Sequence, residues 1–192
     1  VSVGRCGPDG DGVGGKMLAA QGGLEGMVAS TLGFGRDART SEQVVSLDLP
    51  ELLRTILDEA GDAHPEAVNK LRYEGPGHLT VHVRSLAMKR ALTNLILNAL
   101  AYGGSAHTRL LAVQVGGTVT IVIEDEGPGI PPEELERVFE PFYRVESSRN
   151  RETGGTGLGL PIARDIPRAH RGDGVLSNRP HGGLSARVTL PG

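Results

Sequence analysis

The stretch that organises this chain is Arg90-Ala91-Leu92-Thr93-Asn94-Leu95-Ile96-Leu97-Asn98-Ala99-Leu100-Ala101-Tyr102-Gly103. Its apolar residues recur at helical spacing and predict a helix over 86–102 that stops at the following glycines. Asn94 and Asn98 lie one turn apart on that helix, although Asn is a mediocre helix former. Their amide groups suit contacts with Mg²⁺ and phosphate. Taken alone, however, the pair is better explained as a solvated polar face.

A second polar segment follows the predicted strand 118–124. Asp125 comes directly after the apolar end of that strand and is followed by Gly127, Pro128 and Gly129. An acid at this position suits a hydrogen bond from an exocyclic amine such as that of adenine, and the glycines let the backbone approach a flat ring. Asp, Gly and Pro are also ordinary turn residues. On this segment alone, a ligand site and a surface turn explain the sequence equally well.

A glycine-rich run, 154–160, opens the predicted helix 158–169. Successive backbone N–H groups at a helix N-terminus form an anion site, because unpaired donors and the helix dipole point the same way. A dinucleotide-binding fingerprint is not favoured, since no strand precedes the run and its spacing is G-x-G-x-G.

Just before that run, Phe139, Phe142 and Tyr143 cluster in a chain that has only 3% aromatic residues. We expect them to form a hydrophobic anchor at the base of a mobile lid. Arg144 and Arg149 lie on that lid, from which an arginine can reach phosphate groups.

The composition of the 192 residues limits the classes of function. A formal net charge of -3 gives no support to binding of nucleic acid or of anionic membranes. A single cysteine excludes an internal disulfide and is typical of a reducing cytosol. No apolar run approaches the roughly 18 residues of a membrane span. We therefore expect a cytoplasmic location, free or as the cytoplasmic part of a membrane-bound protein, with no membrane segment in this chain.

Mixed periodicities predict the architecture. Strands are predicted near 46–49, 68–73, 79–83, 108–115, 118–124, 175–178 and 186–190, with helices after Pro50, at 86–102, near 133–138 and at 158–169. Gly116-Gly117 predicts a tight hairpin. The expected fold is a two-layer α/β sandwich, with a mixed, mostly antiparallel sheet covered on one face by helices. Residues 1–23 are expected to form a flexible Gly-rich tail.

The order of these segments resembles the ATP-binding catalytic domain of sensor histidine kinases, in the group that shares the Bergerat-type fold with gyrase B, Hsp90 and MutL. Residues 90–103 resemble the N box of that family, 125–129 its first glycine box, 139–144 its F box and 155–160 its second glycine box. The likeness covers about 44–190. It implies that 44–192 form the catalytic domain and that 24–43 are a remnant of the second dimerisation helix.

The resemblance also implies the ligands, ATP and Mg²⁺. Asn98 would ligate the metal, with Asn94 beside it near the phosphates, and Asp125 would bind the adenine amine. Other positions that match the family's boxes would line the nucleotide pocket or meet phosphate: Tyr102, Gly127, Gly129, Ile130, Arg144, Arg149, Gly155, Thr156, Gly157, Leu158 and Gly159.

The implied reaction is transfer of the ATP γ-phosphoryl group to a histidine nitrogen. None of the six histidines has the family's acceptor context, an acidic neighbour followed by Arg and Pro. The expected partner is therefore a histidine-containing dimerisation domain or a full-length kinase, with a response regulator involved indirectly. The alternatives are a nucleotide-binding regulatory module without phosphotransfer and a protein-serine kinase of the same fold.

Overall fold

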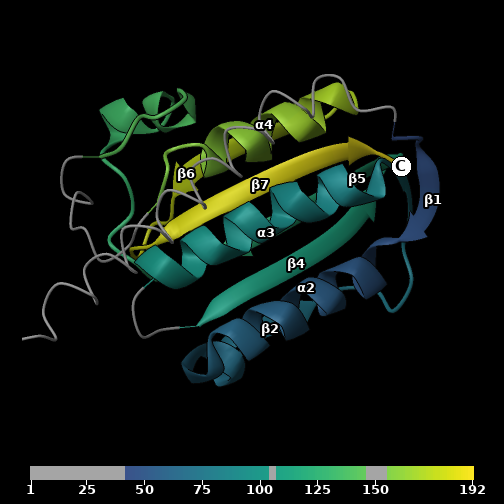
Figure 1. Cartoon of the computed structure of the whole chain (residues 1–192), viewed down its shortest axis with the longest axis horizontal. Helices are drawn as coiled ribbons and strands as arrows, with labels where there is room; N and C mark the ends of the chain where they lie inside the picture. Colours follow the sequence, from purple (N-terminus) through teal and green to yellow (C-terminus); the bar gives the residue numbers. More distant parts are fainter. Residues whose placement is uncertain (1–41, 104–106, 146–154) are drawn as a thin grey trace, which may run out of the picture.

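The computed structural model describes residues 42–103, 107–145 and 155–192. The tail 1–23, almost all of the segment 24–43 and Arg149 therefore lie outside the described residues. The elements follow in the order β1 (Val45–Asp48), α2 (Leu49–Ala63), η1 (Pro65–Lys70), β2 (Leu71–Glu74), β3 (Thr80–Val83), α3 (Ser85–Tyr102), β4 (Thr108–Val115), β5 (Thr118–Glu124), η2 (Pro132–Glu134), η3 (Arg137–Phe139), α4 (Gly159–Ala169), β6 (Asp173–Asn178) and β7 (Leu184–Pro191) (Figure 1).

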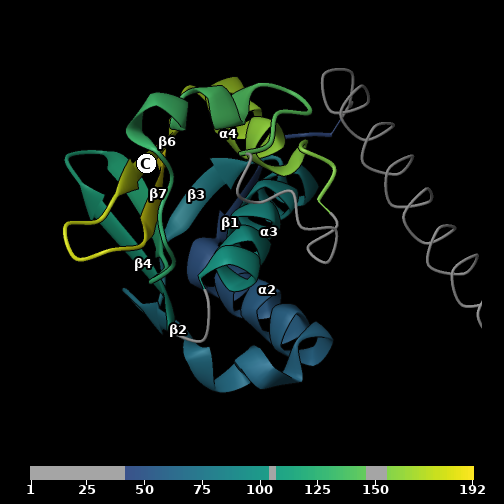
Figure 2. The same cartoon turned by 90° about the vertical axis from the view of Figure 1, so that its left-hand side faces the viewer.

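The strands form a five-stranded sheet in the order β2-β4-β5-β7-β6, together with a separate pair, β1-β3. Only β2 and β4 run parallel, and the other paired strands of the described chain are antiparallel. Figure 2 shows α2 and α3 on one side of the large sheet, with α4 at its upper edge. The predicted sandwich of a mixed, mostly antiparallel sheet and one helical layer is confirmed.

The hairpin of β4 and β5 has the bounds that the sequence predicted. Its turn residues Gly116 and Gly117 both have positive φ angles, 57° and 76°. A two-residue turn with left-handed conformations at both positions matches the twist of the flanking strands. Since β5 ends at Glu124, this hairpin fixes where Asp125 leaves the sheet.

The core lies between α3 and the large sheet. The buried face of α3 consists of Met88, Ala91, Leu92, Leu95, Ile96 and Ala99. Opposite it, Leu110, Ile121 and Val188 from three neighbouring strands are fully buried. Asn94 and Asn98 are only partly buried, at the border of that apolar face. This packing holds α3 rigidly and so positions both amide side chains.

Two segments differ from the prediction. The strand expected over 68–73 begins only at Leu71, because Pro65–Lys70 form a 3-10 helix. Proline suits the first turn of a helix, where its missing N–H is not needed. Val68 is accordingly 54% exposed instead of facing the core. The acidic helix expected over 133–138 is a pair of short 3-10 turns, Pro132–Glu134 and Arg137–Phe139. Within the described ranges, no helix has the length and apolarity needed to cross a membrane.

Candidate functional site

A cavity of about 840 Å³ lies at the C-terminal end of α3. Its walls come from α3, the loop after β5, the segment 138–145 and the start of α4. Figure 1 shows that end of α3 at the left, with the 3-10 turns that follow β5 lying above it. The segments that meet here are far apart in the sequence, so the fold itself builds the cavity.

Most of the candidate residues line this one cavity. They are Asn94, Asn98, Tyr102, Asp125, Gly129, Ile130, Arg144, Gly155, Thr156, Gly157, Leu158 and Gly159. Gly127 does not line it, but its backbone N–H donates a hydrogen bond of 2.8 Å to the Asp125 carboxylate. Arg149 lies outside the described residues.

Asp125 is held tightly and is only 6% exposed. Its Oδ1 accepts hydrogen bonds from the backbone N–H groups of Gly127 (2.8 Å) and Leu184 (3.2 Å). Its own backbone N–H donates to the Leu184 carbonyl at 3.0 Å, and its carbonyl accepts from Arg179 at 2.7 Å. In the described part of the chain, Oδ2 has no hydrogen-bond partner. One carboxylate oxygen therefore fixes the side chain, and the other is left for a ligand.

Two glycines allow this close arrangement. A Cβ atom on Gly127 would lie 2.3 Å from the Tyr102 carbonyl oxygen. Gly183 has a φ of +96°, and a Cβ there would lie 2.0 Å from the Asp125 carbonyl oxygen. Neither contact is possible for a residue with a side chain. The loop after β5 can thus approach both the end of α3 and the turn between β6 and β7.

Asn178 is a contributor that sequence reasoning missed. Its Oδ1 accepts from the Ile130 N–H at 2.9 Å, while its Nδ2 donates to the Ile130 carbonyl at 2.6 Å. This pair of bonds holds Ile130 against the cavity, across 48 positions of sequence. The available signal was the polar pair of Asn178 and Arg179 at the end of a predicted strand, just before Gly182 and Gly183.

The opposite end of the cavity is formed by the N-terminus of α4. The helix begins at Gly159, one residue after the predicted start, and the preceding residue Leu158 provides no side-chain cap. The first N–H groups of a helix have no partner within the helix, and here no capping side chain occupies them. Together with the glycines at 155, 157 and 159, they form the kind of donor array that binds anions.

The aromatic anchor is only partly as predicted. Phe139 and Tyr143 pack against the core, but Phe142 is 58% exposed. Its backbone is left-handed, with a φ of 67°, and its N–H donates to the Gly157 carbonyl at 2.9 Å. The backbone of Phe142, rather than its ring, thus connects this segment to the glycine-rich run.

Asn94 has an unmet hydrogen-bonding group beside the cavity. Its Nδ2 is buried and has no partner among the described residues. Leaving a buried donor unpaired costs about 1–3 kcal/mol, so a polar ligand group at this position would be stabilised. In residues 42–103, 107–145 and 155–192, no three His, Cys, Asp or Glu side chains are grouped to hold a metal. A metal here would therefore rely on amide oxygens and on oxygens of the ligand.

Known proteins are similar to this chain in sequence and in fold. Residues 83–192 match the family model described as histidine kinase-, DNA gyrase B-, and HSP90-like ATPase. Sensor histidine kinase CpxA of Escherichia coli K12 is 34% identical over 173 residues, which are 88% of this chain and 37% of CpxA. This chain thus spans little more than a third of that relative.

Solved structures agree. The ATP-binding domain of PrrB from Mycobacterium tuberculosis superposes with a TM-score of 0.64 at 27% identity, covering 78% of this chain and 98% of that domain. The mycobacterial sensor histidine kinase MprB gives a TM-score of 0.66 at 26% identity, covering 78% and 97%. Because the family model covers more than half of the chain, the chain belongs to the histidine kinase-, DNA gyrase B- and HSP90-like ATPases and contains their ATP-binding domain.

Proposed function

We propose that this chain is the catalytic part of a two-component sensor histidine kinase. It binds Mg·ATP in the cavity and transfers the γ-phosphoryl group to a histidine of a separate dimerisation domain. One observation carries the proposal: a held carboxylate, an amide-bearing helix and an uncapped helix N-terminus line the same cavity. A hydrogen-bond acceptor for a base at one end and anion donors at the other suit a nucleotide.

The adenine end is assigned to Asp125. Its unpaired Oδ2 would accept a hydrogen bond from the exocyclic amine, while the Gly127 N–H holds Oδ1. Tyr102 and Ile130 provide apolar surface on that side of the cavity. A base that places a hydrogen-bond acceptor against this buried carboxylate should bind much more weakly than adenine, because the carboxylate oxygen would be left without a donor.

The phosphate end is assigned to the N-terminus of α4. Backbone N–H groups of Gly155, Thr156, Gly157, Leu158 and Gly159 would meet phosphate oxygens, with Arg144 and Arg149 adding positive charge. Asn94, whose Nδ2 is unpaired, also approaches α4: its Oδ1 lies 3.6 Å from the position that a Cβ on Gly159 would take. The N-box helix and α4 therefore approach each other at the place where the phosphates would lie.

The metal is assigned to Asn98. Mg²⁺ is usually bound by few protein ligands together with substrate phosphates and water. An amide oxygen on a packed helix next to a phosphate site suits that coordination. When bound, Mg²⁺ would neutralise charge on the phosphates. Replacing Asn98 with Asp should change nucleotide affinity more in the presence of Mg²⁺ than with EDTA, as measured by calorimetric titration. Equal changes under both conditions would argue against ligation by this residue.

In the proposed reaction, the bond between the γ-phosphorus and the β,γ-bridging oxygen breaks and a bond to a histidine nitrogen forms. ADP leaves, and the histidine loses its N–H proton to solvent. The protein's contribution is to orient the phosphates and to surround the growing charge with fixed donors. No general base within the chain is required by this scheme.

The test uses the purified chain, γ-labelled ATP and the histidine-containing dimerisation domain of a sensor kinase. Acid-labile, base-stable label on the dimerisation domain is expected. Acid-stable label would indicate transfer to serine instead. Measured ATP binding without any label would indicate a nucleotide-binding regulatory module.

A further inference from the structure

The wall of the cavity formed by residues 131–143 has few backbone connections to the rest of the molecule. Four of its backbone hydrogen bonds lie within the segment and join Glu134 to Pro131, Phe139 to Glu136, Glu140 to Arg137 and Tyr143 to Glu140. Among the described residues, only the bond from the Phe142 N–H to the Gly157 carbonyl leaves the segment. Just before it, Asn178 holds Ile130. The segment is thus attached at both ends through backbone groups, and its middle depends on side chains.

A cation from α4 contacts the middle of this segment. Arg164, in the second turn of α4, is 14% exposed at its side chain. Its Nη1 lies 2.6 Å from Oε2 of Glu136, and its guanidinium carbon lies 4.3 Å from the centre of the Phe139 ring. Arginine suits this double role, because its planar group stacks on a ring while its edge donates hydrogen bonds.

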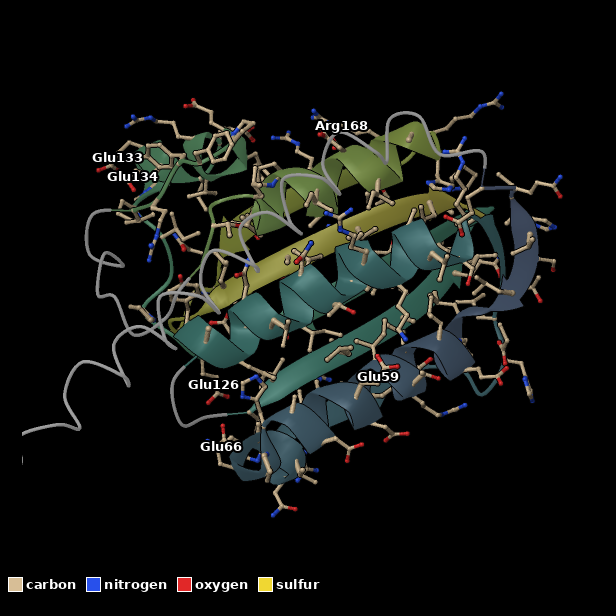
Figure 3. The ribbon with its side chains drawn as sticks, in the orientation of Figure 1. Glu59, Glu66, Glu126, Glu133, Glu134 and Arg168 are labelled. Carbon is tan, nitrogen blue, oxygen red and sulfur yellow. The ribbon has the colours of Figure 1, made fainter. Side chains whose placement is uncertain are left out.

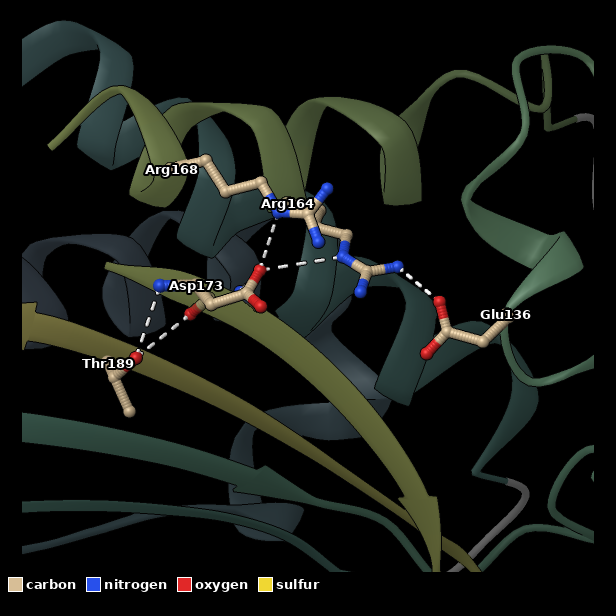
Figure 4. Close-up of polar contacts among 6 residues, drawn as sticks. Glu136, Arg164, Arg168, Asp173 and Thr189 are labelled. Atoms are coloured by element: carbon tan, nitrogen blue, oxygen red, sulfur yellow. Dashed lines mark hydrogen bonds and ion pairs between the residues drawn. The ribbon is translucent and has the colours of Figure 1, made fainter. Parts of the chain in front are cut away.

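The same arginine is anchored to the sheet. Its Nε lies 3.5 Å from Oδ1 of Asp173, which also accepts from Arg168 at 2.7 Å and from the Gly174 N–H at 2.8 Å (Figure 4). The backbone N–H of Asp173 donates in turn to Oγ1 of Thr189 on β7 at 3.1 Å. Figure 4 shows Arg164 lying between Asp173 on one side and Glu136 on the other.

We infer that Arg164 is a positioning residue for nucleotide binding. It holds the segment 131–143 against α4 and β6, and so keeps Val138, Tyr143 and the following Arg144 in the cavity wall. This inference rests on the proposed function, because the wall matters only if the cavity takes a nucleotide. Without Arg164, the segment would have to be ordered when the ligand binds, and that ordering would weaken affinity.

The chain offers a matched control. Arg168 lies one turn further along α4 and shares Asp173, but its only ion pair in the described structure is with that aspartate. Changing Arg168 to Met therefore removes a charge and an Asp173 contact without touching the cavity wall. Changing Arg164 to Met removes the link to Glu136 and Phe139 as well.

Hydrogen exchange without nucleotide is the first measurement. In Arg164→Met, amides of 131–143 should exchange at least several-fold faster than in the wild type, whereas in Arg168→Met they should not. Equal exchange in the two variants would overturn the inference. This readout needs no nucleotide, so it decides the role of Arg164 even if the wild-type chain fails to bind ATP, a result that would refute the proposed function alone.

Affinity is the second measurement, by titration with Mg·ATP. Arg164→Met should raise the Kd about three- to tenfold, and Arg168→Met less than about twofold. In a Phe139→Leu, Glu136→Gln background, Arg164→Met should add almost nothing, because contacting residues are not additive. A full additional loss in that background would show that Arg164 acts otherwise. The Kd of Arg164→Lys should lie between those of the wild type and Arg164→Met, since lysine keeps the charge but cannot stack a planar group on the ring.

Discussion

Replacing Asp125 with Asn separates the structural and the binding role of this carboxylate. The amide oxygen can take the place of Oδ1 and keep both backbone N–H bonds, from Gly127 and Leu184. Its NH₂ group then replaces Oδ2. The reverse orientation would place the NH₂ donor against those two backbone N–H donors and is therefore disfavoured. The variant should therefore fold, with a loss in the free energy of unfolding of no more than about 1 kcal/mol.

The effect on ATP should be far larger. The variant loses a hydrogen bond to a charged acceptor, about 1.5–3 kcal/mol, and leaves an NH₂ donor facing the amine, about 1–3 kcal/mol more. The sum of about 2.5–6 kcal/mol corresponds to a Kd raised roughly 10²- to 10⁴-fold. Calorimetric titration with Mg·ATP measures this, and thermal unfolding of the same sample checks the fold.

Glu126 is the matched control. It is the next residue, is exposed and does not line the cavity, and Figure 3 labels its side chain near the C-terminal end of α3. Glu126→Gln removes the same charge at almost the same place, and should alter the Kd less than about threefold because solvent screens it. If Asp125→Asn bound ATP within threefold of the wild type, the assignment of adenine to Asp125 would be refuted.

Two further predictions concern stability. Gly183→Ala should lower the free energy of unfolding by more than about 2 kcal/mol, because its Cβ would lie 2.0 Å from the Asp125 carbonyl oxygen. Gly182 is the control, since it has a similar φ of +92° but nothing within 4 Å of its Cβ position, and Gly182→Ala should cost only about 1 kcal/mol. Denaturant unfolding measures both costs, and equal costs would argue against the clash. The N–H of Leu79 and the side chain of His78 both hold the pKa of Asp48 below its ordinary value of 3.8. The stabilisation by this carboxylate is therefore present above pH 3.8 and is lost as the pH falls through the lower folded pKa. In Asp48→Asn, the free energy of unfolding should fall less steeply at acid pH than in the wild type. Parallel pH profiles of the two proteins would contradict this.

The sequence predicted best those features that depend on local pattern. Alternating residues and two glycines placed β4 and β5 to the residue, and the apolar period of α3 placed Asn94 and Asn98 correctly. Local pattern failed at Val68, where an apolar residue near a strand belongs to a turn begun by Pro65. The exposed ring of Phe142 was also not predicted, because its left-handed backbone and its hydrogen bond to Gly157, fifteen positions away, leave no local sequence pattern.

Contacts between distant segments explain the remainder. Asn178 holds Ile130 and Leu184 holds Asp125, yet nothing in the local sequence of either pair names its partner. Such bonds depend on which strands become neighbours in the sheet. The alternation of apolar and polar residues along one strand does not predict that order. The sequence therefore indicated residues that line the cavity, but not residues such as Asn178 that hold them in place.

The place of β7 has a consequence for how the molecule is made. This strand, Leu184–Pro191, lies between β5 and β6 and brings Val188 and Leu190 into the core. On the ribosome, the hairpin of β4 and β5 is synthesised long before its neighbour. The nascent chain must keep an open strand edge and an unfinished interior until residues 184–191 emerge, and such intermediates are prone to aggregate. Chaperone demand during synthesis should therefore be set by this late-arriving strand.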